Sequence, residues 1–508
     1  MPKEEVLIAL LVVVAGVARV AGILRVPYPV LLVLGGLAVA AIPGLPTIEL
    51  DPDIVFIVFL PPLLYHAAFM TSPRELKQEW EAVGLLAVGL VAVTIVAVAA
   101  IAHLVAGLDW PAAFVLGAVV GPTDPVAATT VFKRIGLPER LTTILEGESL
   151  TNDGSALVAL RVAIAATGTT VTVLDISWKF VSVAVGGVLI GLAAGWVVSH
   201  VRSRIDDPPV EITISLFTPY LAYIPAEEVG VSGVLAAVTV GLYLAWQAPT
   251  GLFHPSSRLQ ALAFWDVFIF LLNSLLFILI GLQIRPVLSA IEGISTATVI
   301  AAALATIATV IATRLLWMLV VPTVFRSPTT FPERVLLGWS GMRGAVSMAA
   351  ALSIPVDLDG RPLILVITFA VILATLVGQG LTLPALAHKL VTPEEPDVEA
   401  EANARAQAAR AALDELDKAQ GEDDIPEDAI RYARRRYELR LGHLTEEHEN
   451  DTVPAARALQ RRLVEVERRT IERLHADEEL DQATTRRLER ELDLEEERFG
   501  ELDRSSLS

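Results

Sequence analysis

Apolar blocks of about 17 to 30 residues alternate with short polar connections from near the start of the chain to about residue 391. A helix needs roughly 20 apolar residues to cross the hydrocarbon layer of a membrane. The pattern therefore predicts thirteen membrane-spanning helices. They occupy residues 5–24, 27–43, 52–71, 82–106, 110–132, 141–167, 179–200, 210–226, 229–247, 259–282, 296–324, 334–355 and 361–390. We interpret the first block as a span and not a leader, because its polar head is not basic and no small-residue cleavage site follows.

The pattern changes after residue 391. Residues 392–508 are polar and rich in Ala, Glu and Arg, and they predict a linker followed by helices at about 399–420, 425–448 and 454–500. We therefore expect two domains, a transmembrane domain at 1–391 and a cytoplasmic helical tail at 392–508. The tail is either a solvated extension or a domain that regulates the membrane part or supports its dimer. The sequence alone does not separate these two interpretations.

Composition supports a membrane protein with an all-α fold. The chain has 508 residues, of which 54% are hydrophobic, with a mean hydropathy of +0.58. Soluble domains hold roughly 45–50% apolar residues. The sequence contains no cysteine, so it excludes disulfides, thiolate catalysis and cysteine-type metal sites.

Charge is unevenly distributed along the chain. The tail carries 33 acidic and 19 basic residues, which accounts for −14 of the total net charge of −19. This acidity argues against a nucleic-acid partner. In the short connections between spans, an outside N-terminus places 12 Lys and Arg residues inside and 4 outside. The bias predicts a protein of the cell (inner) membrane with its N-terminus outside and its C-terminus in the cytoplasm.

The fifth span contains a helix-breaking motif, Gly121-Pro122-Thr123-Asp124-Pro125. Each proline removes a backbone donor and clashes with the preceding turn, so this helix must kink or unwind near its middle. Freed backbone groups at membrane depth persist only where they line a cavity or meet a partner. Thr123 and Asp124 add oxygen atoms that suit a hard cation. The alternative is a proline kink in which Asp124 caps its own helix.

A second interruption is expected in the twelfth span, where glycines surround Arg343. Spans 1–6 and 8–13 then form two six-helix repeats of opposite topology, with the broken helix fifth in each. Broken helices at matching positions of inverted repeats indicate the binding site of a transporter. Arg343 would neutralise the C-terminal ends of the half-helices, and Asp124 their N-terminal ends.

The sixth span carries polar residues on two adjacent faces. Glu148 and Asn152 are four residues apart, and so are Ser149 and Asp153, so each pair shares a helix face. Carboxylates inside a membrane are costly and are kept for a function. Arg314 is the one charge in the eleventh span and needs a carboxylate partner, for which we choose Glu148.

Two weaker candidates lie elsewhere in the spans. His66 in the third span is either packed as a neutral side chain or lines the cation path. Asn273 in the tenth span either holds helices together or lines a funnel toward the site.

The interrupted and polar spans resemble the monovalent cation/proton antiporter-1 family, which contains the bacterial sodium/proton antiporters and the sodium-hydrogen exchangers. The resemblance covers about residues 1–391. Its motifs are Phe59-Leu-Pro-Pro, Gly121-Pro-Thr-Asp-Pro, Glu148-Ser-Leu-Thr-Asn-Asp-Gly, Val231-Ser-Gly-Val-Leu-Ala, Trp339-Ser-Gly-Met-Arg-Gly-Ala-Val-Ser and Gln379-Gly-Leu-Thr-Leu-Pro.

This resemblance implies a dimerisation part and a mobile core part that work as a homodimer. It implies that Asp153 binds a cation or a proton in turn, and that Asn152 orders the core beside a pair formed by Glu148 and Arg314. Further cation oxygens would come from Thr123, Asp124 and Ser149. Some relatives carry a carboxylate at the position that matches His66, which this chain lacks.

We expect a secondary active transporter that exchanges Na⁺ or Li⁺ for H⁺, electroneutrally and one for one, by alternating access at Asp153. Such a protein would serve pH regulation and sodium homeostasis. A K⁺/H⁺ antiporter with the same mechanism is the alternative, and a cation channel is a more distant one. We expect no enzyme and no cofactor. The expected partners are membrane lipid, a second copy of the chain and a cytoplasmic regulator bound by the tail.

Overall fold

The structure is a computed structural model that describes residues 13–17, 19–21, 23, 24, 26–42, 50–166, 173–205, 207–247, 255–289, 295–324, 329–391, 398–419, 426–446, 463, 465–471, 473, 474, 488 and 492. Within these residues every regular element is a helix. The all-α prediction is thus confirmed. The chain divides into two compact units, Met1–Pro393 and Glu394–Ser508.

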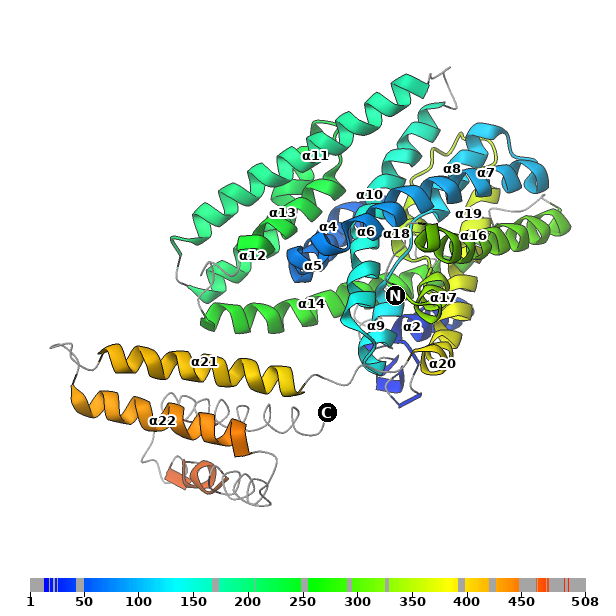
Figure 1. The fold of residues 1–508 in the computed structure, drawn as a ribbon. Helices are drawn as coiled ribbons and strands as arrows, with labels where there is room; N and C mark the ends of the chain where they lie inside the picture. Colours follow the sequence, from blue (N-terminus) through cyan, green and yellow to red (C-terminus); the bar gives the residue numbers. More distant parts are fainter. Residues whose placement is uncertain are drawn as a thin grey trace. The chain divides into compact units, whose positions relative to one another are not determined.

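The first half of the larger unit consists of helices separated by short turns, with π-helical turns labelled η (Figure 1). They are α2 (Tyr28–Ala40), α3 (Pro52–Ile54), η1 (Val55–Phe59), α4 (Leu60–Met70), α5 (Pro73–Gln78), α6 (Trp80–Gly84), η2 (Leu85–Leu90), α7 (Val91–Ala106), α8 (Trp110–Val120), α9 (Val126–Ile135) and α10 (Glu139–Ala166).

The second half of this unit begins after residues 167–172. Its elements are α11 (Val173–Arg202), α12 (Pro208–Glu228), α13 (Gly233–Gln247), α14 (Pro255–Leu282), α15 (Ile284–Ser289), α16 (Thr296–Val324), α17 (Phe331–Trp339), α18 (Ala345–Leu352), α19 (Arg361–Leu373), η4 (Ala374–Gln379) and α20 (Gly380–Leu390).

Six helical stretches of the described chain are both long and apolar enough to cross a membrane. They are Pro52–Met70, Leu85–Ala106, Val181–Arg202, Arg258–Ser289, Thr296–Pro322 and Arg361–Leu390. Shorter apolar helices lie at Tyr28–Ala40, Trp110–Val120 and Gly233–Gln247. The protein is therefore a multi-pass membrane protein. The count of thirteen spans stays a prediction, because the first of them, 5–24, lies largely outside the described residues.

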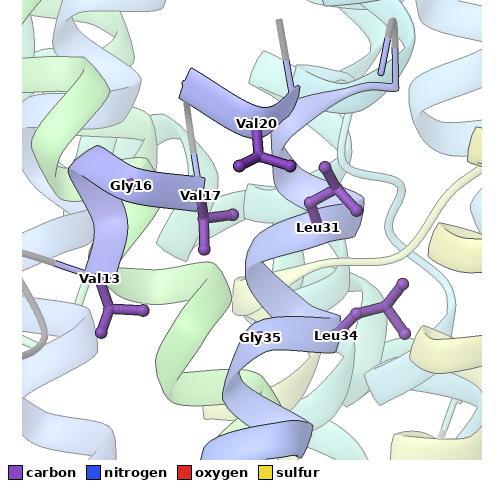
Figure 2. Close-up of a pocket in the computed structure, with 7 residues that line it drawn as sticks. All are labelled: Val13, Gly16, Val17, Val20, Leu31, Leu34 and Gly35. Carbon is purple, nitrogen blue, oxygen red and sulfur yellow. The ribbon is translucent and has the colours of Figure 1, made fainter. Parts of the chain in front are cut away.

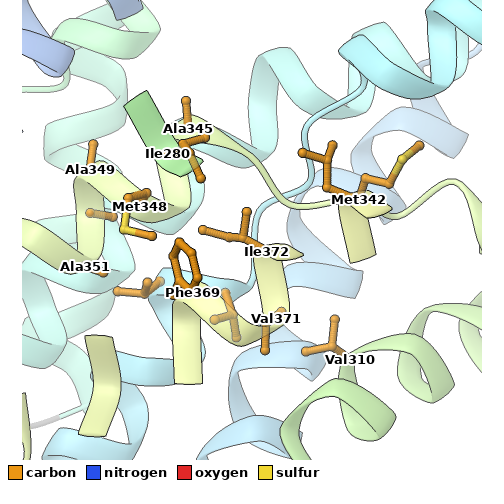
Figure 3. Packing of buried hydrophobic residues seen from close by; sticks show 14 of the residues in the cluster. Ile280, Val310, Met342, Ala345, Met348, Ala349, Ala351, Phe369, Val371 and Ile372 are labelled. Carbon is orange, nitrogen blue, oxygen red and sulfur yellow. The ribbon is translucent and has the colours of Figure 1, made fainter. Parts of the chain in front are cut away.

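Both predicted interruptions are confirmed. The fifth span is α8 followed by α9, with residues 121–125 outside either helix. The twelfth span is α17 followed by α18, with residues 340–344 between them. Apolar side chains surround the second break: Figure 3 shows Ala345 near Met348 and Phe369, with Met342 on the far side of Ile372, all of them buried in one cluster. The irregular backbone is thus enclosed by protein, as the low dielectric of a membrane requires.

The helices of this unit pack in two groups. The first, which we call the α11–α13 group, consists of α4, α11, α12 and α13, with α14 packed against α12 (Figure 1). The second, the crossing group, consists of α7, α8, α10, α16 and α17 together with the half-helices α9 and α18 and the last span. Helix α10 belongs to the crossing group and also contacts α4, α11 and α13. It therefore runs along the boundary between the two groups.

An apolar groove lies between the first helical segment and α2 (Figure 2). Gly16 and Gly35 leave room on its floor, and Val13, Val17 and Leu34 are among the side chains on its walls. A groove without polar groups offers nothing to an ion, but it suits a lipid chain or another helix.

The smaller unit contains α21 (Val398–Ala419) and α22 (Glu427–Glu446), which pack against each other. Ala406, Ala409 and Ile430 are buried between them, and Arg434 pairs with Asp417. The linker at 392–397 and most of the predicted third helix at 454–500 lie outside the described residues.

Candidate cation site at two interrupted helices

The two interrupted spans touch at their breaks. The backbone N–H of Asp124 donates to the carbonyl oxygen of Met342 at 2.7 Å. Each break thereby satisfies part of the backbone polarity that the other break exposes. This crossing fixes four helix ends at one place in the protein interior.

Asp124 lies at the two N-terminal ends. Its Oδ1 accepts a hydrogen bond from the backbone N–H of Val126, the first residue of α9, at 3.0 Å. The backbone N–H of Ala345, the first residue of α18, also acts electrostatically on its carboxylate. One side chain thus caps two half-helices, where a negative charge is stabilised by the exposed N–H groups. A Cβ on Gly344 would lie 2.6 Å from the Asp124 carboxyl carbon, so only glycine fits there.

Arg343 lies at the C-terminal ends. Its guanidinium is buried and donates from Nε to the carbonyl oxygen of Val120, the last residue of α8, at 3.0 Å. It also donates to the carbonyl of Gly341, just beyond α17. Its own backbone N–H donates to Thr375 Oγ1 at 3.1 Å, which ties the break to the last span. The cation therefore satisfies carbonyl groups that the half-helices leave open.

The structure brings Glu148 and Arg314 together as a bidentate pair. Arg314 donates to Glu148 Oε1 and Oε2 at 2.5 and 2.8 Å, and both side chains are only 1% exposed. Arg314 Nε also donates to the carbonyl oxygen of Leu337, on α17, at 3.1 Å. The pair thereby connects α10, α16 and α17. A buried pair of this kind costs much when one partner is removed.

Thr123 and Asn152 extend this pair into a network. The Thr123 hydroxyl donates to Glu148 Oε1 at 2.8 Å and accepts from Asn152 Nδ2 at 2.9 Å. Asn152 is fully buried. The side chains of Glu148, Arg314, Thr123 and Asn152 thus hold one another in place, which joins the break in the fifth span to α10.

Ser149 and Asp153 stand apart from that network. Both are buried, with 7% and 6% exposure, and they lie one turn apart on the same face of α10. Over the residues that the structure describes, no hydrogen bond reaches the Ser149 hydroxyl or the Asp153 carboxylate. The carboxylates of Asp124 and Glu148 lie close enough to act electrostatically on Asp153.

The buried charges at the crossing do not cancel. Three carboxylates, the half-buried Asp124 and the buried Glu148 and Asp153, lie there with two buried guanidinium groups, Arg314 and Arg343. With all five groups ionised, the site carries one net negative charge. One proton or one monovalent cation would neutralise it.

The two weaker candidates lie on the α11–α13 group and α14. His66 on α4 stacks on Trp265 with ring centroids 5.6 Å apart, and its Nε2 is buried without a partner in the described structure. The charged residues Asp266 and Lys133 act on the His66 ring electrostatically. Asn273 is buried on α14, 7% exposed. In the described structure no hydrogen bond joins either residue to the network around Glu148.

Of the ion pairs in the described part of this unit, the sequence predicted the one between Glu148 and Arg314, and two of the others join neighbouring helices away from the crossing. Arg161 on α10 donates to Glu227 on α12 at 2.5 Å, and Arg202 lies 3.6 Å from Glu211, where both are almost fully buried. The sequence did indicate that each arginine needs a partner, because a charge in an apolar span is costly. The sequence offered several acceptors for each arginine and no means of choosing among them.

Comparison with known proteins gives matches to sodium/hydrogen exchangers and to cation/H⁺ antiporters. Residues 6–389 match the family model described as the transmembrane sodium/hydrogen exchanger. The chain is 36% identical over 384 residues to the Na⁺/H⁺ antiporter ApNhaP of Aphanothece halophytica, covering 74% of this chain and 72% of the relative. It is 33% identical over 415 residues to a sodium, potassium, lithium and rubidium/H⁺ antiporter of Bacillus pumilus, covering 76% of this chain and 62% of that protein.

A solved structure shares the fold. The sodium proton antiporter MjNhaP1 of Methanocaldococcus jannaschii, determined at pH 8, aligns with a TM-score of 0.61 at 23% identity. The alignment covers 76% of this chain and 98% of that protein.

Proposed function

Since the chain belongs to the sodium/hydrogen exchanger family, we propose that it exchanges Na⁺ or Li⁺ for H⁺ by alternating access at Asp153. It is accordingly a membrane transporter and not an enzyme. We place it in the cell (inner) membrane, with its N-terminus outside and its tail in the cytoplasm, and we propose that it works as a homodimer in pH regulation and sodium homeostasis.

One observation carries the assignment of the site. At the crossing, the side-chain oxygens of Ser149 and Asp153 and the amide Oδ1 of Asn152 have no hydrogen-bond partner among the described residues, and of these three residues Asp153 alone can carry a charge. Hydroxyl and carboxylate oxygens are the ligands that hard cations prefer. Thr123 and Asp124 already make hydrogen bonds to Glu148 and to the start of α9. We therefore propose that they contribute additional ligands, through their remaining lone pairs, to the coordination shell of the cation.

Exchange follows from competition at one carboxylate. Burial disfavours a bare charge, so Asp153 needs either a proton or a cation whenever water is excluded from it. A cation that arrives with Ser149 and its neighbours as ligands displaces the proton, and a proton at higher concentration displaces the cation. Movement of the crossing group against the α11–α13 group then exposes the site to the other side. Glu148 stays out of this exchange because Arg314 neutralises it.

We expect the purified protein to move protons when a monovalent cation is supplied. In proteoliposomes that contain a pH-sensitive dye, addition of Na⁺ or Li⁺ on one side should change the dye signal, and choline should not. A Na⁺, Li⁺, K⁺ and Rb⁺ series at equal ionic strength distinguishes the alternatives. A response to K⁺ as large as that to Na⁺ would favour the broader selectivity named for the Bacillus pumilus relative. A current through single open proteins would indicate a channel instead.

We expect exchange to be electroneutral. The site carries one net negative charge when Asp153 is ionised, and either one proton or one Na⁺ brings it to zero, so both loaded forms cross without net charge. The rate should therefore stay unchanged when valinomycin and a K⁺ gradient impose a membrane potential of either sign. A rate that rises or falls systematically with the potential would contradict one-for-one exchange.

A further inference from the structure

The ion pair between Arg161 and Glu227 joins the two helix groups of the membrane unit. Arg161 lies on α10, in the crossing group, eight residues beyond Asp153. Glu227 lies at the end of α12, in the α11–α13 group. In the proposed orientation both residues are at the outer ends of their helices, so the pair lies between the site and the outside.

The carboxylate of Glu227 is positioned from its own side. Its Oε1 accepts the backbone N–H of Gly233, the first residue of α13, at 3.0 Å, and its Oε2 accepts from Arg161. A Cβ at Gly233 would lie 2.9 Å from Glu227 Cγ and 2.8 Å from Tyr223, so glycine makes room for this arrangement. Glu227 is therefore held at the turn between α12 and α13 by a contact that does not depend on Arg161.

Leu157 lies between the pair and the site. It is four residues after Asp153 and four before Arg161, so the three side chains share one face of α10. Leu157 also packs against apolar clusters of both helix groups. To reach Asp153 from the outside along this face, water or a cation must pass between α10 and the α11–α13 group. The ion pair between Arg161 and Glu227 holds these two together.

We propose that Arg161 and Glu227 form an outer latch, which is closed in this structure and opens when the site faces outside. The proposal rests on the proposed function, since it requires the helix groups to move during transport. Helix α10 carries Asp153 and Arg161 together, so a displacement that opens the outer path moves Arg161 away from Glu227. The latch favours the outward-closed form by the energy of one part-exposed ion pair, because a contact made in only one state shifts the balance between states.

The first test measures access from outside without any transport assay. The chain lacks cysteine, so Leu157→Cys introduces a single reporter that a membrane-impermeant maleimide can label. Adding Glu227→Gln should raise the labelling rate roughly two- to fivefold, the range that a part-exposed ion pair supports. Glu228→Gln, at the exposed neighbouring position, should leave the rate unchanged. Equal rates in the Glu227→Gln and Glu228→Gln backgrounds would overturn the latch.

The second test closes the latch covalently and does not depend on the charge variants. In Arg161→Cys/Glu227→Cys, a short bis(methanethiosulfonate) should link the two helices through two disulfides, with methanesulfinate as the leaving group, and reduce exchange to the level of protein-free vesicles. A dithiol reductant cleaves these disulfides and should restore exchange. Either variant alone, treated identically, should keep its rate. Full exchange by the linked protein would overturn the proposal, as would failure of the two introduced cysteines to react with each other. If the unmodified protein exchanged no cation at all, the proposed function would fail while the Leu157→Cys test still decided the latch.

Discussion

Cation-driven proton movement should fall to the background of empty vesicles when Asp153 is replaced by Asn. An amide has nearly the shape of the carboxyl group but holds neither a proton nor a negative charge at any working pH. Exchange needs a group that takes up one of these ligands when the other leaves, and the other two carboxylates at the crossing are engaged with Arg314 and with the half-helix ends. The measurement is dequenching of a pH dye by Na⁺ or Li⁺ in everted vesicles.

The control for this variant is Asp357→Asn, the same chemical change at an exposed position near the start of the last span. It should keep the rate of the unmodified protein. Asp153→Asn protein should be present in the membrane in a normal amount, since the Asp153 side chain makes no hydrogen bond to any described residue. Retained exchange in well-expressed Asp153→Asn would refute the assignment of the site.

Replacement of either Glu148 or Arg314 by Ala should strongly destabilise the protein. Each change leaves an uncompensated charge in a position that is 1% exposed, which costs about 3–5 kcal/mol in proteins. Loss of Glu148 also removes the acceptor of the Thr123 hydroxyl, so the break in the fifth span loses a contact. A large fall in the unfolding temperature in detergent is the expected observation for both single variants.

The double variant separates an ion pair from two independent contributions. With both side chains truncated, no buried charge is left alone, so the unfolding temperature should recover part of the loss. The matched control is the pair between Lys133 and Glu146, at 3.0 Å, in which the lysine is 67% exposed. Its single alanine variants should change stability by about 0–1 kcal/mol. Losses at Glu148 and Arg314 that simply add would show that the pair does not act as a unit.

Sequence reasoning located the interruptions because their causes are local. Pro122 and Pro125 cannot continue a helix, and the glycines around Arg343 weaken one, so both breaks lie where the residue types require them. The pairing of Glu148 with Arg314 could be expected for a different reason. Arg314 is the one charge in its span, and few buried carboxylates were available to compensate it.

The rest of the site depends on contacts that no spacing reveals. The sequence treats Thr123 and Ser149 alike, as hydroxyls near Asp153, whereas the structure engages Thr123 with Glu148 and Asn152 and leaves Ser149 open. The acceptor of Arg161 lies 66 residues away on another helix group. The short helix α5 and the π-helical turns η1, η2 and η4 were also missed, since they interrupt or precede apolar runs without a distinctive composition.

The excess of one carboxylate over the guanidinium groups at the crossing also affects the protein when neither a proton nor a cation is bound. Moving a site with one bare negative charge through a low-dielectric interior costs roughly 2.5–3.5 kcal/mol more than moving a neutral one, which slows the empty return about a hundredfold or more. Under the proposed mechanism, the empty carrier would therefore return slowly, and either ion would cross alone only at that reduced rate. A cell could then keep many copies of such a protein in its membrane with little leak of protons down their gradient.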